Sequence, residues 1–436
     1  MAPLELMFLH GATKGEVVRA LVLGRARWSV GKPYAAELER LPETYSWCLA
    51  ASVSELGDWI RNSADGPLLV IGSGGSFTSA SFSEFLHQVC TGRIAKALTP
   101  LEAVHSPLDL RHTNVLIMTA GGKNPDIIGA FSRLVEREPR SLGVLCTRGR
   151  TPLTRLASRT GRTRIFDFDI PSGKDGYLAT NSLIATITLV VRAYESAGLT
   201  RPVLPDAFLA LLPGRVTPAV FTRGLAVKAQ PLWTRRTLIV LHTPATQAAA
   251  VDLEARFSEA ALGSVQVADY RNFAHGRHYW LAVRGNETGI VAFVTREVTD
   301  LADRTLRLVP EEVPTLRIDL PEEGALASLS AVLHSLYLAQ LAGDATGVDP
   351  GRPSVPDFGR RLYRIQAFRR PPKHDAPLPA AETIAIERKA RTTIRSLESR
   401  GELERWRSAY RHFRSNLLSL SSAPFRNSFK INDLRK

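Results

Sequence analysis

Short apolar runs rich in β-branched residues alternate with helix-length segments over most of the chain. In the first half these runs are PLLVIG (67–72), NVLIMTA (114–120), LGVLCT (142–147) and RIFDFDI (164–170). In the second half they are TLIVLHT (237–243), GIVAFVT (289–295) and TLRIDLP (315–321). Strands that are buried on both faces have this composition, and their alternation with helices is typical of βαβ units. The pattern predicts an α/β fold built on parallel sheets.

The same pattern divides the chain into segments. Helical stretches at about 245–262 and 325–342 accompany the later strands, and a helical, proline-containing connector separates the two groups of strands. We expect an N-terminal segment at 1–44, a first α/β domain at 45–200, a connector at 201–233, a second α/β domain at 234–346, a Pro- and Arg-rich arm at 347–380, and a basic helical tail at 381–436. Ligands of such sheets bind where strands lead into helices, so these loops are the candidate sites.

A glycine- and serine-rich loop follows the first apolar run and precedes a helix. Its candidate ligand-binding residues are Gly72, Ser73, Gly74, Gly75, Ser76 and Thr78. Glycines allow a ligand to approach the backbone, while free N–H groups, the positive helix end and hydroxyl donors favour a phosphate. The loop matches neither a P-loop nor a G-x-G-x-x-G fingerprint. A tight turn with ordinary capping serines is the alternative interpretation.

A second loop in the same position follows the run NVLIM. Its candidate residues are Thr119, Gly121, Gly122, Lys123 and Asn124, and Pro125 then begins a helix. The two glycines and the lysine place a flexible backbone and a cation at the same rim as the first loop. Two such loops at successive strand ends indicate an anion-binding site, although paired turns remain the alternative.

Charge adds a basic excess to this picture. The 436 residues include 56 Lys and Arg against 42 Asp and Glu, which gives a formal net charge of +14. Residues 381–436 hold 13 basic and 6 acidic side chains, and therefore half of that excess. A basic balance is compatible with nucleic acid, a membrane surface or a small anionic ligand, and composition does not choose among them.

Other features exclude several classes of protein. Three cysteines, Cys48, Cys90 and Cys146, are too few for a disulfide framework and lack zinc-ribbon spacing. The N-terminus lacks a basic region ahead of its short apolar stretch, and no window of about 18 uncharged apolar residues is evident. We therefore expect a cytoplasmic protein without a membrane partner.

Taken in order, these motifs resemble a known family. The succession of GSGGS after a strand, TAGGKNPD after a strand, CTRGRTPLTRLA after a strand, and then GKDGYLATNSLIAT is similar to a sugar isomerase (SIS) domain. In that family the corresponding loops hold the phosphate of a phosphosugar. The second half resembles another SIS domain, so residues 45–345 are similar to the tandem isomerase half of glucosamine-6-phosphate synthase. The resemblance implies two tandem three-layer αβα domains, a homodimer, and a site that can be shared between subunits.

The resemblance also implies two catalytic residues. The family carries a glutamate in its second SIS domain and a histidine sixteen residues later, and Glu259 and His275 have this spacing here. Proton transfer between the first two carbons of a sugar, through an enediol, needs a carboxylate, and ring opening needs a group that titrates near neutrality. Asp252, Arg256 and Glu259 share one helical face, so Arg256 can hold a carboxylate in place. A solvated charged stripe with a surface histidine is the alternative.

Departures from the family pattern limit the predicted function. Lys123 replaces hydroxyl donors in the second loop, Thr180, Asn181 and Ser182 stand where Ser-Thr-Lys is usual, and Arg277 replaces a proline. The glutamine-hydrolysing domain is missing, so glutamine-dependent amination is not expected. We expect binding of a phosphorylated or otherwise anionic sugar, with aldose–ketose isomerase or amino-sugar deaminase/isomerase chemistry. No cofactor is expected, and the two histidines of HGRHY lack a third ligand for a metal.

The basic tail leaves further alternatives open. Leu403, Trp406, Tyr410, Phe413 and Leu417 form an apolar seam with arginines on the other faces. Such a stripe favours packing on the domains or on a second subunit. A non-catalytic sugar-phosphate sensor, whose tail contacts a partner, is the second functional hypothesis. Nucleic-acid binding is a third, less favoured one, because it rests on charge without a known binding motif.

Overall fold

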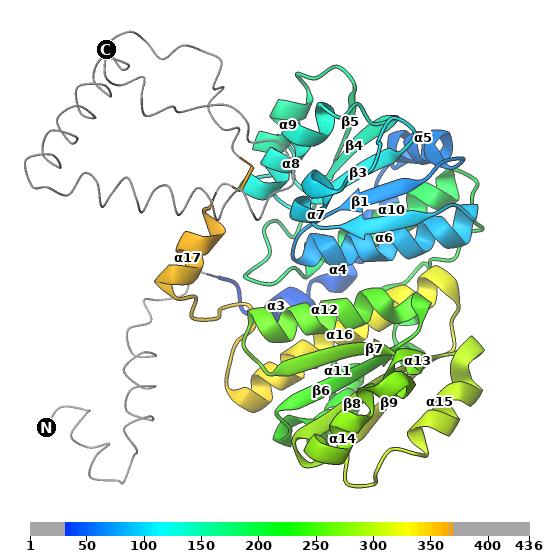
Figure 1. The fold of residues 1–436 in the computed structure, drawn as a ribbon, viewed down its shortest axis with the longest axis vertical. Coiled ribbons are helices and arrows are strands. Elements are labelled where there is room, and N and C mark those ends of the chain that lie inside the picture. Colours follow the sequence, from blue (N-terminus) through cyan, green and yellow to red (C-terminus); the bar gives the residue numbers. More distant parts are fainter. Residues whose placement is uncertain (1–30, 366, 369–436) are drawn as a thin grey trace, which may run out of the picture. The chain divides into compact units, whose positions relative to one another are not determined.

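Two parallel β-sheets form the framework of the protein. The computed structural model describes residues 31–365 and 367–368 (Figure 1). Sheet A has the strand order β2-β1-β3-β4-β5 and sheet B the order β7-β6-β8-β9. The strands are β1 Leu68–Ile71, β2 Ala95–Leu98, β3 Asn114–Thr119, β4 Ser141–Cys146, β5 Thr163–Asp167, β6 Thr237–His242, β7 Ser264–Asp269, β8 Thr288–Thr295 and β9 Thr315–Leu320. The predicted α/β class with parallel sheets is confirmed.

The seven predicted strands are all present, and two further strands were not predicted. These are β2 and β7, which lie at the edges of sheet A and sheet B. Their sequences, AKAL and SVQVAD, are short or interrupted by polar residues, so neither forms a continuous apolar run. The other edge strands, β5 and β9, were among those predicted.

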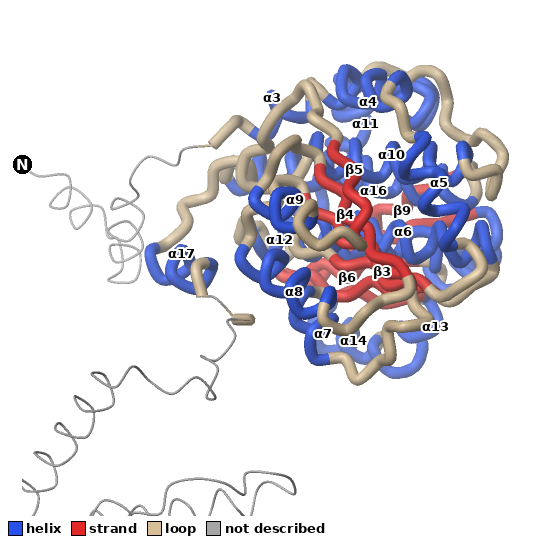
Figure 2. The backbone as a smooth tube through the Cα atoms, turned by 90° about the horizontal axis from the view of Figure 1, so that it is seen from above, coloured by secondary structure: helices blue, strands red, loops and turns tan. Residues whose placement is uncertain are grey.

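Helices cover both faces of each sheet, as Figure 2 shows from above. Those with eight or more residues are α4 Leu41–Ala50, α5 Ser54–Ser63, α6 Gly75–Thr91, α8 Pro125–Val135, α10 Asn181–Ser196, α11 Pro218–Ala229, α12 Gln247–Glu259, α15 Thr299–Leu306 and α16 Gly324–Thr346. The shorter ones include α3 Tyr34–Leu38, α7 Pro100–His105, α9 Pro152–Ala157, α13 Tyr270–Asn272, α14 Tyr279–Arg284 and α17 Asp357–Tyr363.

The largest hydrophobic core lies between the two sheets. Alternate residues of each strand point to opposite faces, so Val70 and Met118 of sheet A and Val240 and Phe293 of sheet B face this shared core. Helices α6, α12 and α16 contact one another there. Two smaller cores cover the outer faces, one beneath α7, α8 and α9 and the other beneath α13, α14 and α15. Helices α6 and α12 therefore join the two halves.

Helix α16 is long and apolar enough to cross a membrane by length and composition. Its most apolar window is 83% buried inside the protein, and it is the one described helix that meets this test. The described residues belong to one compact unit, and the predicted tail at 381–436 lies outside them. The six-part division of the chain stays a prediction.

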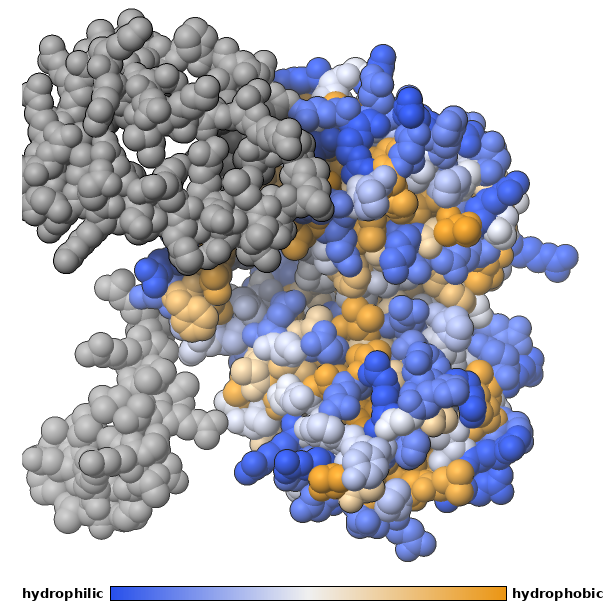
Figure 3. Space-filling view, in the orientation of Figure 1, coloured by the Kyte–Doolittle hydropathy of each residue, from blue (hydrophilic) through white to orange (hydrophobic). Residues whose placement is uncertain are grey.

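On the face seen in Figure 3, hydrophobic residues lie in small groups among hydrophilic ones.

Candidate functional site

The two glycine loops flank the switch point of sheet A. Strands β1 and β3 are neighbours, whereas the chain leaves β1 toward β2 on one side and reaches β3, β4 and β5 on the other. Loops that diverge in this way leave a crevice at the carboxyl ends of the strands, where ligands of open α/β sheets bind. The loop after β1 and the loop after β3 therefore begin at the carboxyl ends of adjacent strands, and the space beside them is the candidate crevice.

The first loop presents several donors that are not used by the protein. The amides of Ser73, Gly74 and Gly75 donate to no acceptor among the described residues, and the hydroxyls of Ser73 and Ser76 have no partner there. Gly74 has a φ of 55°, and a Cβ at Gly75 would lie 2.3 Å from Cβ of Ala179. A larger residue at Gly75 would push the loop away from its neighbour. The loop is thus a tight turn that leaves its donors open.

Thr78, the last candidate of the first loop, faces away from the crevice. Its side chain is buried, and Oγ1 donates to Oδ1 of Asp252 on α12 at 3.0 Å. The hydroxyl therefore connects α6 with α12, and the structure does not place it beside the open donors.

The second loop uses most of its side-chain polar groups internally. Thr119 Oγ1 accepts from the amide of Gly122 at 3.2 Å, and Asn124 Oδ1 caps α8 by accepting from the amide of Asp126 at 2.7 Å. Gly122 has a φ of 54° and packs against Thr151. Lys123 is exposed, with no ion pair in the described part of the chain. The loop therefore offers a ligand backbone amides and one cation.

The predicted donors at the start of α10 are buried. Asn181 bonds to Thr44 and to the carbonyl of Glu37, and the Thr180 hydroxyl lies 3.3 Å from Oε2 of Glu37. The carboxylate of Asp175 accepts from the amides of Thr180 and Ser182 at 3.1 and 3.0 Å. The Asp175 carboxylate thus occupies the position at this helix end where an anion would bind. Thr180 and Asn181 are therefore not open to the crevice.

Glu259 reaches the first loop from the other half of the protein. Helix α12 packs antiparallel to α6. Asp252, earlier on α12, bonds to Thr78, whereas Oε1 of Glu259, at the end of α12, lies 3.8 Å from the position of a Cβ at Gly74, just before α6 begins. By solvent accessibility the residue is exposed. Partial burial raises the pKa of Glu259, Arg256 opposes this effect, and the charges of Asp252 and Glu254 add to it. A carboxylate with a raised pKa is thus held beside unused donors.

A buried ion pair supports this carboxylate from behind. The guanidinium of Arg256 bonds to both carboxylate oxygens of Asp252, and each side chain is at most 3% exposed. Arg256 also donates to the Tyr34 hydroxyl at 2.9 Å and to the carbonyl of Ala179 at 2.7 Å. Burial alone would lower the pKa of Arg256, but the charge of Asp252, with smaller contributions from Tyr34 and Glu259, raises it. Arg256 is fully engaged by the protein and positions the wall of the crevice.

His275 lies away from Glu259 within one chain. Glu259 ends α12 just before β7 begins, and His275 follows the end of β7. Six residues of extended strand span roughly 20 Å, so the two side chains lie at opposite ends of sheet B. His275 is exposed, in a π-helical turn from Phe273 to Arg277. The sixteen-residue spacing therefore does not bring the two residues together in one subunit.

Two further residues lie at the crevice that the sequence analysis did not single out. Tyr177, 44% exposed, lies two residues from Ala179, and the charge of Glu259 adds to the effect of partial burial in raising its pKa. Glu37 is buried and accepts from the amide of Gly176 at 2.7 Å, which fixes the loop that carries Tyr177. The available signal for Glu37 was a carboxylate within an otherwise apolar helix. That helix lies in the part of the chain assigned to the N-terminal segment at 1–44.

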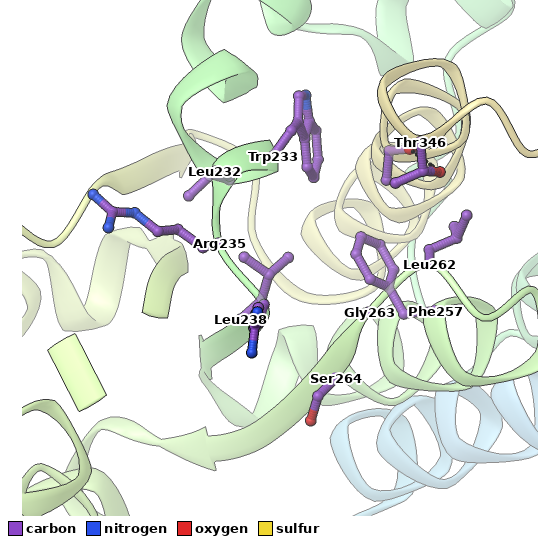
Figure 4. A pocket seen from close by; sticks show the side chains of 11 residues that line it. Leu232, Trp233, Arg235, Leu238, Phe257, Leu262, Gly263, Ser264 and Thr346 are labelled. Atoms are coloured by element: carbon purple, nitrogen blue, oxygen red, sulfur yellow. Dashed lines mark hydrogen bonds between the residues drawn. The ribbon is translucent and has the colours of Figure 1, made fainter. Parts of the chain in front are cut away.

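The corresponding switch point of sheet B is closed. The loops after β6 and β8 carry Thr243, Thr246 and Thr295 in place of glycines, and their hydroxyls bond to one another across the gap. A separate cavity of about 20 Å³ lies at the amino ends of β6 and β7 (Figure 4). Its volume suits about one water molecule and excludes a sugar. In the described residues no group of three or more His, Cys, Asp or Glu side chains is placed to hold a metal.

Comparisons with known proteins support the fold. The chain matches no protein-family model and no curated protein. Among solved structures it is similar to tagatose-6-phosphate ketose/aldose isomerase from Escherichia coli, with a TM-score of 0.59, 13% identity, and coverage of 76% of this chain and 98% of that one. It is also similar to glucosamine-6-phosphate deaminase from Thermotoga maritima, with a TM-score of 0.54, 13% identity, and coverage of 73% and 97%.

A third solved structure is also similar to this chain. The C-terminal domain of glucosamine-fructose-6-phosphate aminotransferase from Francisella tularensis has a TM-score of 0.54 and 14% identity, with coverage of 72% of this chain and 96% of that domain. At these identities the likeness establishes the fold alone. The protein therefore has the SIS-type fold of phosphosugar isomerases.

The buried ion pair generates a prediction about stability. Replacing Arg256 by Ala leaves Asp252 charged and unpaired in the core, so we expect the free energy of unfolding to fall by about 3–5 kcal/mol. Urea denaturation followed by circular dichroism measures the loss. The control is Arg304→Ala, which breaks an exposed pair with Asp300 and should change stability by no more than about 0.5 kcal/mol. Equal losses in the two variants would contradict the assigned role of Arg256.

Glu37 generates a prediction about pH. Burial first and the charge of Asp175 second raise the pKa of Glu37 to about 7, against its ordinary value of 4.5, and this rise persists despite hydrogen bonds from Gly176 and Thr180 and the charge of Lys32. The folded protein thus holds this proton more tightly than the unfolded chain. The resulting stabilisation is complete below about pH 4.5 and is lost as the pH rises through about 7.

The variant Glu37→Gln removes this titration. We expect the stability of the wild type relative to this variant to fall by up to about 3 kcal/mol between pH 4.5 and pH 8. Thermal unfolding of both proteins across this range measures the difference. Glu39→Gln, an exposed neighbour on the same segment, is the matched control. A pH-independent difference between wild type and Glu37→Gln would refute the assignment.

Proposed function

We propose that the protein binds a phosphorylated sugar at the switch point of sheet A and transfers a proton between adjacent carbons through an enediol. The observation that carries this proposal is the Glu259 carboxylate, which lies against Gly74 of a loop with unused amide and hydroxyl donors. Structural neighbours with this fold include a tagatose-6-phosphate ketose/aldose isomerase and a glucosamine-6-phosphate deaminase. Aldose–ketose isomerisation, or deamination coupled to isomerisation, is the reaction class.

The arrangement accounts for each chemical step. Glu259 takes the proton from the carbon beside the carbonyl and returns it to the neighbouring carbon, and its raised pKa brings the base toward the working pH. The negative charge that develops on the carbonyl oxygen in the transition state is stabilised by the open amides and serine hydroxyls of the first loop. Arg256 connects α12 to the segment before α10, since it donates to the carbonyl of Ala179, whose side chain lies against Gly75 of the first loop.

We further propose that His275 acts in the site of a second copy of the chain. Within one subunit His275 lies at the far end of sheet B, yet ring opening requires a group that titrates near neutrality. Beside His275 is a shallow groove of about 440 Å³ lined by Gln266, Gly276, Arg277, Tyr279, Trp280, Val283 and Arg284. Tyr279 and Val283 are exposed there, which suits a surface that a second subunit covers. A homodimer would thus complete each site.

A non-catalytic sensor is the second candidate function. The observation in its favour is that Thr78, Thr180 and Asn181 are buried in internal bonds, so fewer side-chain donors remain for a substrate than the family resemblance implied. In this case the sugar phosphate would bind without turnover, and the basic tail would contact the partner.

The catalytic proposal predicts the effect of removing the base. We expect Glu259→Gln to lower kcat by about 100- to 10,000-fold with little change in the dissociation constant, because general-base catalysis is lost while binding groups remain. The measurement is nuclear magnetic resonance of hexose 6-phosphates in deuterated water, which follows both isomerisation and solvent exchange at C2. Glu55→Gln, an exposed carboxylate on α5, is the control and should retain activity within about twofold. Binding without exchange in the wild type would favour the sensor.

The shared site predicts complementation between inactive subunits. Glu259→Gln and His275→Ala should each be inactive alone, whereas an equal mixture refolded together should regain about one quarter of wild-type activity, since half of the dimers contain one intact site of two. Activity is measured at equal total protein, with size-exclusion chromatography to confirm dimers. The double variant carrying both changes, mixed with Glu259→Gln, is the control that restores nothing. Absence of recovery in the first mixture would overturn the shared site.

A further inference from the structure

Positive charge is concentrated in one segment of the described chain. Residues 31–368 carry 36 Lys and Arg against 33 Asp and Glu, so this part of the protein is close to neutral as a whole. Residues 139–166, which run from just before β4 into β5, hold seven arginines and no acidic side chain. The rest of 31–368 holds 29 basic and 33 acidic side chains. Such a charge asymmetry indicates a surface for a polyanion.

Four of these arginines lie on or beside helix α9. This helix packs against β5, which is an edge strand of sheet A (Figure 1). Arg155 and Arg159 are four residues apart on a chain that continues to turn after the helix, so they lie about one helical turn apart. Arg150 precedes the helix, Arg162 follows it, and all four residues are exposed. We call these four residues, 150, 155, 159 and 162, the arginine stripe.

Few acidic groups neutralise the arginine stripe. Nη1 of Arg162 lies 3.3 Å from Oε1 of Glu138, and both side chains are largely exposed. Asp167 accepts from the backbone amide of Arg150 and lies at that end of the stripe. In the part of the chain that the structure describes, Arg155 and Arg159 form no ion pair.

Protection of an edge strand explains only part of this pattern. Charged side chains on an edge strand prevent pairing with another sheet, which would account for arginines on β5 itself. Arg155 and Arg159 lie outside β5, where they protect no strand edge. Their unpaired charges therefore call for a partner.

The surface around the arginine stripe lacks apolar anchors. Every large hydrophobic side chain that is exposed in the described residues lies outside 142–169. Protein interfaces have an apolar or aromatic centre, peripheral membrane segments insert apolar side chains, and single-stranded nucleic acids stack their bases on aromatic rings. A duplex keeps its bases inside and presents rows of phosphates, to which basic side chains bind without apolar contacts. The composition of this surface therefore favours a duplex over the other three partners.

We propose that the arginine stripe binds the phosphate backbone of a nucleic-acid duplex without reading its sequence. A guanidinium remains charged at any relevant pH and can donate two parallel hydrogen bonds to phosphate oxygens. This interaction requires neither the crevice nor the basic tail. It is thus separate from the proposed sugar binding and from the tail-based hypothesis that the sequence raised.

The test measures affinity and its salt dependence with the full chain. Fluorescence anisotropy follows the binding of two short labelled DNA duplexes of different sequence. The stripe variant carries Arg155→Gln, Arg159→Gln and Arg162→Gln, and it keeps Arg150, which follows the carboxyl end of β4. The control variant removes the same charge from exposed residues on and before α11, through the substitutions R215Q, R223Q and K228Q.

We expect the wild type to bind both duplexes with equal affinity. The stripe variant should bind at least about tenfold more weakly at about 100 mM salt, and the slope of log affinity against log salt should fall by about two to three, since each phosphate contact contributes about 0.9. The control variant should change the slope by less than about one. Lysine at the same three stripe positions should retain most of the affinity, because each charge remains.

Several outcomes would overturn this inference. Equal losses in the stripe and control variants would show that binding reflects total charge. Absence of duplex binding by the wild type, a preference for one duplex, or tighter binding of the corresponding single strand would contradict sequence-independent duplex binding. Stripe-dependent binding of polyglutamate or of phosphatidylserine vesicles, without binding of the duplex, would assign the stripe to an acidic protein or a membrane instead. Equal Tm values show that any loss does not come from unfolding.

Discussion

The buried pair of Asp252 and Arg256 is the interaction on which the arrangement of the site depends. Asp252 accepts from Thr78 on α6 and from Ser335 on α16, while Arg256 reaches Tyr34 near the start of the described chain and Ala179 before α10. Five separate segments thus meet at one ion pair between the two sheets. A buried charge is tolerated only where its partners are complete, so the pair fixes the spacing of α6 and α12. That spacing brings Glu259 of one half to Gly74 of the other.

One group of backbone amides that could bind an anion is occupied by a carboxylate of the protein, and another group is free among the described residues. At the start of α10, Asp175 accepts the amides that a phosphate could have used, and Glu37 fixes the same loop from below. The loops after β1 and β3 have no internal carboxylate on their free amides among the described residues. The free backbone amides described for the site therefore lie in these two loops. The helix end that the family resemblance suggested as a binding element instead serves as a rigid wall.

The sequence specified the sheets well and the side-chain roles less well. Apolar, β-branched runs located seven strands, including the edge strands β5 and β9, while β2 and β7 escaped because AKAL is short and SVQVAD is interrupted by polar residues. The glycine loops follow β1 and β3 and precede helices, as predicted, and a Cβ at Gly75 would collide with the side chain of Ala179. The sequence could not predict the buried hydrogen bonds of Thr78, Thr180 and Asn181. A hydroxyl or amide gives the same sequence signal whether it faces a ligand or a carboxylate of the protein. Tyr177 emerged only from its exposure beside Ala179.

The two sheets show why a repeated architecture yields one candidate crevice rather than two. Both have a switch point between a central strand and its neighbour, β1 and β3 in sheet A and β6 and β8 in sheet B. In sheet A glycines leave backbone donors free, whereas in sheet B the hydroxyls of Thr243, Thr246 and Thr295 satisfy one another. Sheet B contributes instead through the ends of its elements, with Glu259 directed at sheet A and His275 exposed at the opposite end. The difference between glycine and threonine at equivalent loops therefore leaves free backbone donors beside sheet A and not beside sheet B, which is the asymmetry that the proposed function uses.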